Sequence, residues 1–393
     1  MIRDESISRF LALNRKAQVE PDLLELLQAF VGIRRDQQAD PFTFYESELD
    51  SPIHSRFPTV NRFLNNNTHV DPRVSQFLAQ YAEEMRKQRL PFIFNQKHFC
   101  SMFDIDANLL KDIINNKSSY YRTFYISKNN QRGKRTIEAP ADVLKNIQRK
   151  LDKQMLSQVK MSGYAHAYRR DRSIKTNASF HVNKDVVVRI DIKDYFHSFK
   201  QESISAYLER LGYTKSVAAL IAELVTFKGR MPMGAPTSPS ISNLLSHSLD
   251  KRLASLAFNL DANYTRYADD LVFSANNRRL PGMIPVIYGI LEQEGFNPNR
   301  KKTLVRKKWQ RQVVTGIVVN KELNVSKDDY RRLRAVVHNC IKGNLEDQAS
   351  RWGTEDVATF KYQLHGKISY LRYIKPSLGD ALLAEYKSIN WPA

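Results

Sequence analysis

The pattern of apolar and polar positions divides the chain into a helical beginning, a mixed α/β centre and a helical end. Over residues 1–39 apolar side chains recur every three or four positions, as on the buried face of a helix. Residues 40–70 are rich in Pro and Asn and are predicted to form loops. The next helix is predicted to start at Asp71-Pro72 and to end near Pro91. Residues 1–91 are therefore expected to form a helical N-terminal extension.

The centre of the chain alternates predicted helices with short runs of β-branched residues. We predict two strands over Tyr121–Ser127 and Lys134–Glu138, joined by the polar, glycine-containing turn that a hairpin needs. Further strands are predicted over Val186–Ile192, 264–268, 271–275 and 313–319. Helices are predicted over roughly 97–115, 142–158, 201–211, 214–226, 238–255 and 283–294.

The C-terminal part returns to a helical pattern. Ser326 is a predicted N-cap, with Asp329 three residues further on. An apolar stripe follows, and Gly343 is placed to end the helix. The stripe consists of Leu333, Val336, Val337 and Cys340.

Length and charge add a size and a class of partner. A chain of 393 residues suggests two or three subdomains, and 42% hydrophobic residues can fill a sizeable core. Lys and Arg number 61 against 41 Asp and Glu, a formal charge of +20. This surplus, interleaved with 18 Tyr and 20 Phe, favours nucleic acid as the partner, because cations contact phosphates while bases stack on rings. A merely solubilising surface is the alternative.

The two cysteines, Cys100 and Cys340, exclude a disulfide framework and a C-x-x-C zinc site. They fit a reducing cytosol. Residues 1–30 contain no apolar secretory core, and no run of about 18 apolar residues predicts a membrane span. We expect a cytoplasmic protein with no membrane partner.

Three carboxylates have unusual settings. Asp191 stands near the end of an apolar predicted strand, and Asp269 and Asp270 occupy the turn of a predicted hairpin. If these strands share a sheet, the three acids lie close together, and clustered carboxylates favour a hard divalent cation. An Asp-Asp pair in a turn is also common as a solvated turn, so this pattern alone leaves both interpretations open.

Five segments together resemble the motifs of reverse transcriptases, in the order and with the spacing of that family. The resemblance covers about residues 92–320. Residues 189–196 (Arg-Ile-Asp-Ile-Lys-Asp-Tyr-Phe) resemble motif A, and Gly234–Pro239 resembles motif B. Tyr267–Asp270 (Tyr-Ala-Asp-Asp) resembles motif C, Asn297–Thr303 motif D, and Gly133–Pro140 the fingers motif.

This resemblance implies a right-hand polymerase of the α/β class, with an α+β palm. Fingers and palm are expected over 92–320 and a helical thumb over 321–393, beside the N-terminal extension. The implied catalytic and metal-binding carboxylates are Asp191, Asp269 and Asp270, with the Ile192 carbonyl as a backbone ligand. Two Mg²⁺ ions would activate the attacking hydroxyl and stabilise the leaving pyrophosphate.

The resemblance also implies nucleotide contacts. Phe196 falls at the position of a steric gate that favours dNTPs, although an ordinary core Phe is equally compatible with the sequence. Met233 stands where many reverse transcriptases have Gln, and a thioether cannot replace the hydrogen bonds of an amide. The expected nucleotide-binding residues are Arg122, Lys134, Arg135, Asp194, Tyr195, Phe196, Met233, Gly234 and Lys302.

Two short segments are similar to elements of retron reverse transcriptases. Asn177–His181 matches an Asn-Ala-x-x-His element before motif A, and Val314–Gly316 matches a Val-Thr-Gly element before the thumb. The implied partner is a structured noncoding RNA, copied from the 2′-OH of an internal guanosine into a branched RNA–DNA hybrid. Anti-phage defence with a separate effector protein is also implied. The expected RNA-binding residues are Asn177, His181, Thr315, Gly316, Lys327, Arg331, Arg332 and Arg334.

Three alternatives remain open at this point. One is another bacterial reverse transcriptase, of a defence-associated unassigned group or of the group II intron type. Another is a catalytically idle RNA-binding scaffold, which intact acids at all three positions disfavour. A nucleotide cyclase has a related palm, but its usual Gly-Gly-acid-acid-Phe hairpin is absent.

Overall fold

The computed structural model describes residues 81–83, 85–93, 95–127, 133–354 and 356–392. The helix predicted over 1–39, the loops predicted over 40–70 and the helix start predicted at Asp71-Pro72 lie outside these residues. The end of that last predicted helix is described: residues 81–83 and 85–87 are helical. None of the described helices is long and apolar enough to cross a membrane.

The described chain divides into two compact units. Unit 1 contains the described residues up to Ser162 together with Asp194–His247, and unit 2 contains Gly163–Lys193 together with the described residues from Ser248 onward. The sequence instead predicts boundaries after residues 91 and 320, between the N-terminal extension, the fingers and palm, and the thumb. Those boundaries stay predictions.

Unit 1 is a helical unit with one two-stranded hairpin. Strand β1 (Tyr121–Ser127) pairs antiparallel with β2 (Lys134–Pro140), as predicted. Its helices are α5 (Gln96–Phe103), α6 (Ala107–Asn115), α7 (Asp142–Gln154), α9 (Gln201–Arg210), α10 (Lys215–Val225) and α11 (Ser238–Leu245). Their apolar faces form its core, since Leu110, Leu144 and Ile221 have no exposed surface.

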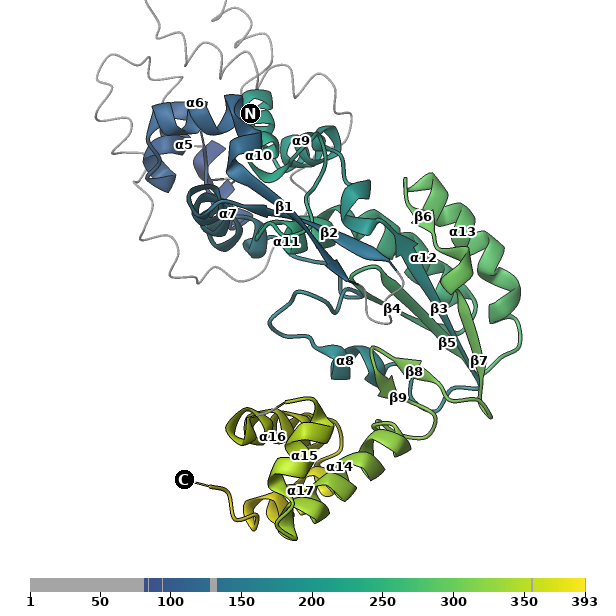
Figure 1. Cartoon of the computed structure of the whole chain (residues 1–393). Helices are drawn as coiled ribbons and strands as arrows, with labels where there is room; N and C mark the ends of the chain where they lie inside the picture. The colour runs from purple at the N-terminus through teal and green to yellow at the C-terminus, as the bar shows by residue number, and fades with distance from the viewer. Residues whose placement is uncertain (1–80, 84, 94, 128–132, 355, 393) are drawn as a thin grey trace, which may run out of the picture. The chain divides into compact units, whose positions relative to one another are not determined.

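Unit 2 is built on a five-stranded antiparallel sheet (Figure 1). Its central strand, β3 (Val186–Lys193), pairs with β5 (Asp270–Ala275) on one side and with β6 (Asn297–Pro298) and β7 (Leu304–Lys307) on the other. Strand β4 (Ala262–Tyr267) lies at the edge, next to β5. The β-branched run of β3 explains its central place, because both faces of such a strand are covered.

One face of this sheet packs on α12 (His247–Asn259). There Arg266 donates to both oxygens of Asp250 at 2.7 and 2.8 Å, and both residues are fully buried. Tyr264 donates to the same carboxylate at 2.8 Å. A buried charge pair of this kind is costly to break, so it fixes β4 against the helix. Helix α13 (Ile284–Gln293) follows β5 in the chain.

The opposite face of the sheet packs on α8 (Ile174–Ser179), whose N-cap Ser173 and Thr176 form a reciprocal capping box. Just beyond this helix, His181 lies between two strands. Its ring nitrogens are 2.7 Å from the Ser274 hydroxyl of β5 and 2.7 Å from the Thr265 hydroxyl of β4. These bonds fasten α8 to the sheet.

Three helix and strand predictions need correction. Residues 313–319 form a tight hairpin rather than one strand: β8 (Val313–Val314) pairs with β9 (Ile317–Val318). Thr315 and Gly316 form its two-residue turn with φ of 47° and 84°, the left-handed geometry that such turns require. The helix predicted over 238–255 is two helices, because Ser246 separates α11 from α12. The helix predicted over 142–158 ends at Gln154, and a short 3-10 turn follows.

The C-terminal part of unit 2 is helical, as predicted. It contains α14 (Lys327–Ile341), α15 (Leu345–Trp352), α16 (Val357–Ile374) and α17 (Pro376–Lys387). Ser326 caps α14 by accepting a hydrogen bond from the Asp329 amide. The predicted stripe of α14 packs against Phe360 and Leu364 of α16, so this stripe is confirmed as a core face.

We expect the free energy of unfolding to decrease as the pH falls below about 6.5, in part because of His181. Burial lowers the pKa of His181 from 6.5 to about 3. The unfolded chain therefore takes up the proton first, and stability present above the ordinary pKa is lost as the pH falls, by up to about 1.4 kcal/mol per pH unit for this group. Urea unfolding between about pH 7 and pH 5 measures this slope.

His181→Gln should show a smaller loss of stability over the same pH range. The matched control is His365→Gln, at an exposed histidine of α16, which should keep the slope of the unchanged protein. Equal slopes for His181→Gln and the unchanged protein would show that His181 contributes nothing to it.

Candidate active site

The three carboxylates meet where β3 and β5 pair in unit 2. Asp191 lies directly opposite Asp270 in the register of the two strands. Asp269 precedes Asp270 in a two-residue turn whose other member, Ala268, has a φ of 57°. The Ile192 amide donates to the Asp269 carbonyl at 2.9 Å, which ties this turn to β3. The local backbone thus holds all three acids at one end of the β3–β5 strand pair.

Cationic side chains of the chain itself contact two of these acids. Arg189, two residues before Asp191 on the same face of β3, donates to Asp270 at 2.6 Å. The Lys302 ammonium lies 3.1 and 3.2 Å from the two oxygens of Asp191. Asn299 adds a side-chain hydrogen bond to Asp191 at 2.9 Å. These contacts offset part of the repulsion between the carboxylates.

The pKa values of Asp269 and Asp270 are nevertheless raised. Burial, followed by the charge of Asp191, raises the pKa of Asp269. Burial also raises the pKa of Asp270, against the opposing effect of Arg189. Both shifts mean that these carboxyl groups hold a negative charge less readily here than in water.

The donor set fits Mg²⁺, which prefers carboxylate oxygens. In the described part of the chain no three acidic, His or Cys side chains converge closely enough to form a ready-made metal site. Two of the carboxylates are instead paired with Lys302 and Arg189. Lys302 contacts both oxygens of Asp191, whereas Arg189 contacts only one oxygen of Asp270. The Ile192 carbonyl stays a predicted ligand.

The other motif A residues belong to unit 1. Asp194 is exposed and left-handed, with a φ of 51°. Tyr195 is 3% exposed, and its hydroxyl lies 2.9 Å from the Ser246 hydroxyl at the end of α11. Phe196 is half-buried against the Tyr195 ring, with ring centroids 5.5 Å apart. Tyr195 thus anchors this segment, and a direct nucleotide contact by its buried side chain is not available in this conformation.

Gly234 has a backbone reason to be glycine. Its φ is 131°, and a Cβ there would lie 3.0 Å from the Glu138 carbonyl oxygen of β2. The Glu138 amide also donates to the Met233 carbonyl at 2.8 Å. Motif B and the β1–β2 hairpin are therefore joined main chain to main chain, and the Met233 side chain takes no part in the joint.

The predicted triphosphate-binding cations lie on the β1–β2 hairpin and are all exposed. Arg122 and Arg135 share one face, because Arg122 pairs with Ala139 and Ile126 with Arg135. Lys134 projects from the other face, where its ammonium lies 5.9 Å from the centre of the Tyr125 ring. The three predicted residues therefore do not form one cluster.

Sequence comparisons supply the family. Residues 126–318, which contain the three acids, match the family described as reverse transcriptase (RNA-dependent DNA polymerase). The Retron Mx65 reverse transcriptase of Myxococcus xanthus is 35% identical over 287 residues, covering 68% of this chain and 64% of that protein. This chain belongs to the retron-type reverse transcriptases.

Two further relatives agree. The Retron Mx162 reverse transcriptase of Myxococcus xanthus is 34% identical, covering 65% of this chain and 58% of that protein. The Retron Ec86 reverse transcriptase of Escherichia coli is 28% identical, covering 79% of this chain and 99% of that protein. The chain thus spans less than two thirds of the two Myxococcus proteins and nearly all of the Escherichia coli protein.

The two retron-like segments of this reverse transcriptase lie together, although about 140 residues separate them in sequence. The Thr315 hydroxyl donates to the Ile174 carbonyl of α8 at 3.0 Å. Ala178 and Val314 belong to one buried cluster, and Figure 1 shows α8 beside the β8–β9 hairpin. Gly316 of the second segment is exposed, and so are Ser179 and Phe180 of the first.

Asn177 and His181 require a correction. Both were expected to bind RNA, and both have no exposed surface. His181 spends both ring nitrogens on Thr265 and Ser274. In this conformation neither side chain can touch RNA. His181 links the end of α8 to the sheet, whereas neither side-chain amide atom of Asn177 has a hydrogen-bond partner in the described structure.

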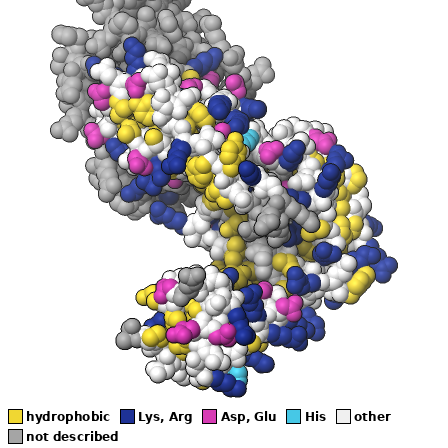
Figure 2. Space-filling model, in the orientation of Figure 1, with side chains coloured by type: hydrophobic (Ala, Val, Ile, Leu, Met, Phe, Trp, Pro, Cys, Tyr) yellow, Lys and Arg dark blue, Asp and Glu magenta, His cyan; other side chains and the backbone are white. Residues whose placement is uncertain are grey.

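The predicted cations of α14 (Lys327, Arg331, Arg332 and Arg334) are all exposed. Lys and Arg side chains gather over the region of β7 and α14 in Figure 2. Next to β7, Trp309 is 80% exposed, and the Lys307 ammonium lies 5.2 Å from its ring centre. This combination of an exposed ring and cations suits single-stranded nucleic acid, and binding by these residues stays a prediction.

Sequence reasoning missed several partners of the acids and of motif B. Arg189 and Asn299 lie inside motifs A and D, and strand alternation places Arg189 on the face of Asp191, so its role could have been found. Glu138 is 2% exposed, with the Arg230 guanidinium at 2.9 Å and the His197 ring at 3.5 Å. Nothing local in the sequence marks that long-range cluster.

Asp269→Asn should raise the melting temperature of the metal-free protein by about 1–3 °C near neutral pH. Because burial raises the pKa of Asp269 in the folded state, its charged form opposes folding once the pH exceeds that pKa. Differential scanning fluorimetry in EDTA measures the change. Asp270→Asn is the matched comparison, and it should give no such rise because Arg189 loses its partner. An unchanged or lower melting temperature for Asp269→Asn would contradict this account.

Proposed function

We propose that the protein is an RNA-directed DNA polymerase that uses Asp191, Asp269 and Asp270 as its catalytic acids. The proposal is carried by one observation: in a chain of the reverse transcriptase family, Asp191 lies opposite Asp270 across the β3–β5 pair, and Asp269 lies in the adjoining turn. Two bound Mg²⁺ ions would activate the attacking hydroxyl and neutralise the leaving pyrophosphate. Asp191 and Asp270 would hold the metal from adjoining strands, and Asp269 would do so from the turn.

The two cations beside the acids have distinct proposed roles. Lys302 is 62% exposed, so it can leave Asp191 and contact the phosphates of an incoming dNTP. Arg189 is 30% exposed and would hold the Asp270 carboxylate in place. We also assign dNTP binding to Arg122 and Arg135, which share one face of the hairpin, and sugar selection to Phe196. Lys134, on the other face, would contribute only if the hairpin turned that face to the nucleotide.

The predicted subdomains have the following roles in this proposal. Residues 92–320 would supply the fingers and palm, and 321–393 the thumb. The two cysteines fit the proposed cytoplasmic location, since neither forms a disulfide in the structure and both are buried.

The retron relatives support a finer proposal about the substrate. The protein would bind a structured noncoding RNA of its own operon, start DNA synthesis from the 2′-OH of an internal guanosine and produce a branched RNA–DNA hybrid. The exposed turn at Gly316 and the cations of α14 would contact that RNA. We further propose that the protein acts in anti-phage defence together with a separate effector protein.

Asp269→Asn and Asp270→Asn should each lower DNA synthesis on a poly(rA)–oligo(dT) primer–template by at least about a thousandfold, because each removes a metal ligand. Radiolabelled dTTP incorporation in the presence of Mg²⁺ measures the rate. The control is Asp185→Asn, an exposed acid before β3, which should retain normal activity. Normal synthesis by either folded variant would refute the catalytic assignment.

Protein purified from its native operon should carry one dominant RNA joined to DNA through a 2′–5′ linkage. Sequencing the bound nucleic acid identifies the RNA, and an enzyme that cleaves 2′–5′ branches should release the DNA as a faster-migrating band. Intron RNA, a mixture of unrelated RNAs, or DNA without a branch would reject the retron proposal and leave the polymerase proposal standing.

A further inference from the structure

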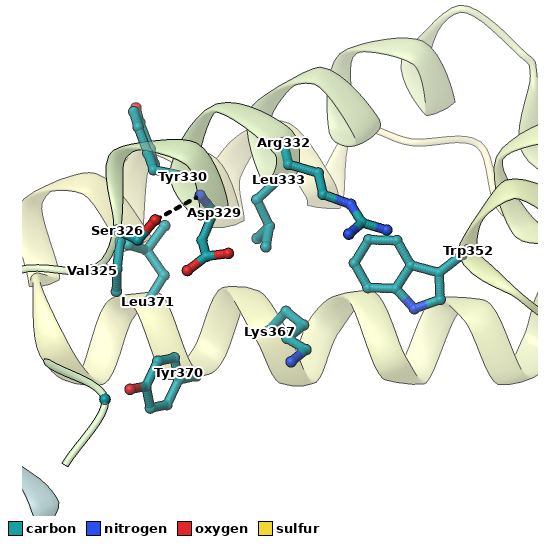
Figure 3. A pocket seen from close by; sticks show the side chains of 11 residues that line it. Val325, Ser326, Asp329, Tyr330, Arg332, Leu333, Trp352, Lys367, Tyr370 and Leu371 are labelled. Carbon is teal, nitrogen blue, oxygen red and sulfur yellow. Dashed lines mark hydrogen bonds between the residues drawn. The ribbon is translucent and has the colours of Figure 1, made fainter. Parts of the chain in front are cut away.

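A cavity of 350 Å³ lies in unit 2 between the start of α14, the middle of α16 and the tip of the β8–β9 hairpin (Figure 3). This size is at the lower end of the range of about 300–1,000 Å³ typical of small-molecule sites. Leu333 and Leu371 give it an apolar wall, and Gly316 lies at its edge. Its size therefore suits one small group, such as a single base, rather than an extended duplex.

Two oppositely charged side chains, both exposed, line this cavity from facing helices. Figure 3 shows the Asp329 carboxylate directed down from α14 and the Lys367 side chain on α16 below it. No salt bridge joins these two side chains in the described structure. The Asp329 amide is bonded to the Ser326 hydroxyl at 3.3 Å, so the backbone of this residue is fixed at the helix start. The cavity thus presents an acceptor and a donor to the same ligand.

Aromatic rings stand at both ends of the cavity. At one end the Arg332 guanidinium lies 5.4 Å from the centre of the Trp352 ring, and the indole N–H donates to Gln363 at 2.9 Å, which orients that ring. At the other end is Tyr370, whose pKa is raised by burial and by the charge of Asp329. Its hydroxyl therefore stays protonated and can donate. Ring faces and a guanidinium plane are the surfaces on which unpaired bases stack.

We propose that this cavity binds an unpaired guanine of the RNA partner. A carboxylate accepts from adjacent donors, and guanine presents N1–H and N2–H side by side. An ammonium donates to acceptors, and guanine presents O6 and N7. Adenine would turn its N1 acceptor toward Asp329, and cytosine and uracil each present one donor group where guanine presents two adjacent ones. The inference rests on the proposed function, since it assigns a recognition site for the RNA of that function.

The test is the binding of four fluorescein-labelled RNA pentanucleotides, UUXUU with X as G, A, C or U, to the full chain by fluorescence anisotropy. The unchanged protein should bind the G pentanucleotide about tenfold more tightly than the others. Asp329→Asn should bring the four affinities within about twofold, and Lys367→Met should also reduce the preference. Asp328→Asn is the matched control, because Asp328 is the neighbouring acid on the first turn of α14, is exposed like Asp329 and does not line the cavity.

DNA synthesis on poly(rA)–oligo(dT) separates failure of this inference from failure of the proposed function. Asp329→Asn should leave that synthesis unchanged, because a homopolymer template contains no guanine. Equal affinity of the unchanged protein for all four pentanucleotides, or a guanine preference that survives Asp329→Asn, would overturn the guanine site while synthesis continues. Absence of synthesis by the unchanged protein would instead overturn the proposed polymerase function.

Discussion

Repulsion among three carboxylates is the constraint around which unit 2 is organised. Asp191 lies opposite Asp270 on two hydrogen-bonded strands, and Asp269 lies in the turn directly before Asp270. Such a cluster opposes folding unless something fixes the backbone and something else offsets the charge. The register of the strands fixes the backbone, and Arg189 and Lys302 offset part of the negative charge. Because those two cations contact the carboxylates that a metal would use, stability without metal and readiness for metal compete at the same atoms.

The charged side chains on the two faces of the sheet have different environments. On the α12 face the Arg266–Asp250 pair and the Tyr264 hydroxyl form a fully bonded polar group without exposed surface. On the other face, Asp191 and Asp270 share the surface with Thr265 and Ser274, because side chains alternate along each strand. His181 and α8 cover only the far half of that face. The acid end stays partly open, with 24% and 20% of the two side chains exposed.

Local patterns predicted much of this arrangement, and long-range contacts account for what they missed. The β-branched run before Asp191 and the strand-like arms around Asp269 predicted the central sheet, and the stripe of α14 predicted a core face. The sequence pattern predicts one strand over 313–319 because six of these seven residues are β-branched Val, Ile or Thr, yet Thr315 and Gly316 both adopt left-handed backbone angles. The partners of His181 lie 84 and 93 residues away, so its burial could not be read from its neighbours.

The same small helix that covers the sheet also receives the C-terminal helices. The Tyr373 hydroxyl at the end of α16 donates to the Ser173 hydroxyl at 2.6 Å, and the Lys175 ammonium donates to the Tyr373 carbonyl at 2.7 Å. Ile374 joins the buried cluster of Ala178 and Val187. Since Ser173 caps α8 and His181 fastens it to β4 and β5, these contacts run continuously from α16 to the strand that carries Asp270. An RNA held by α14 and α16 would therefore be held in a fixed relation to the carboxylates, which is what copying a single defined template requires.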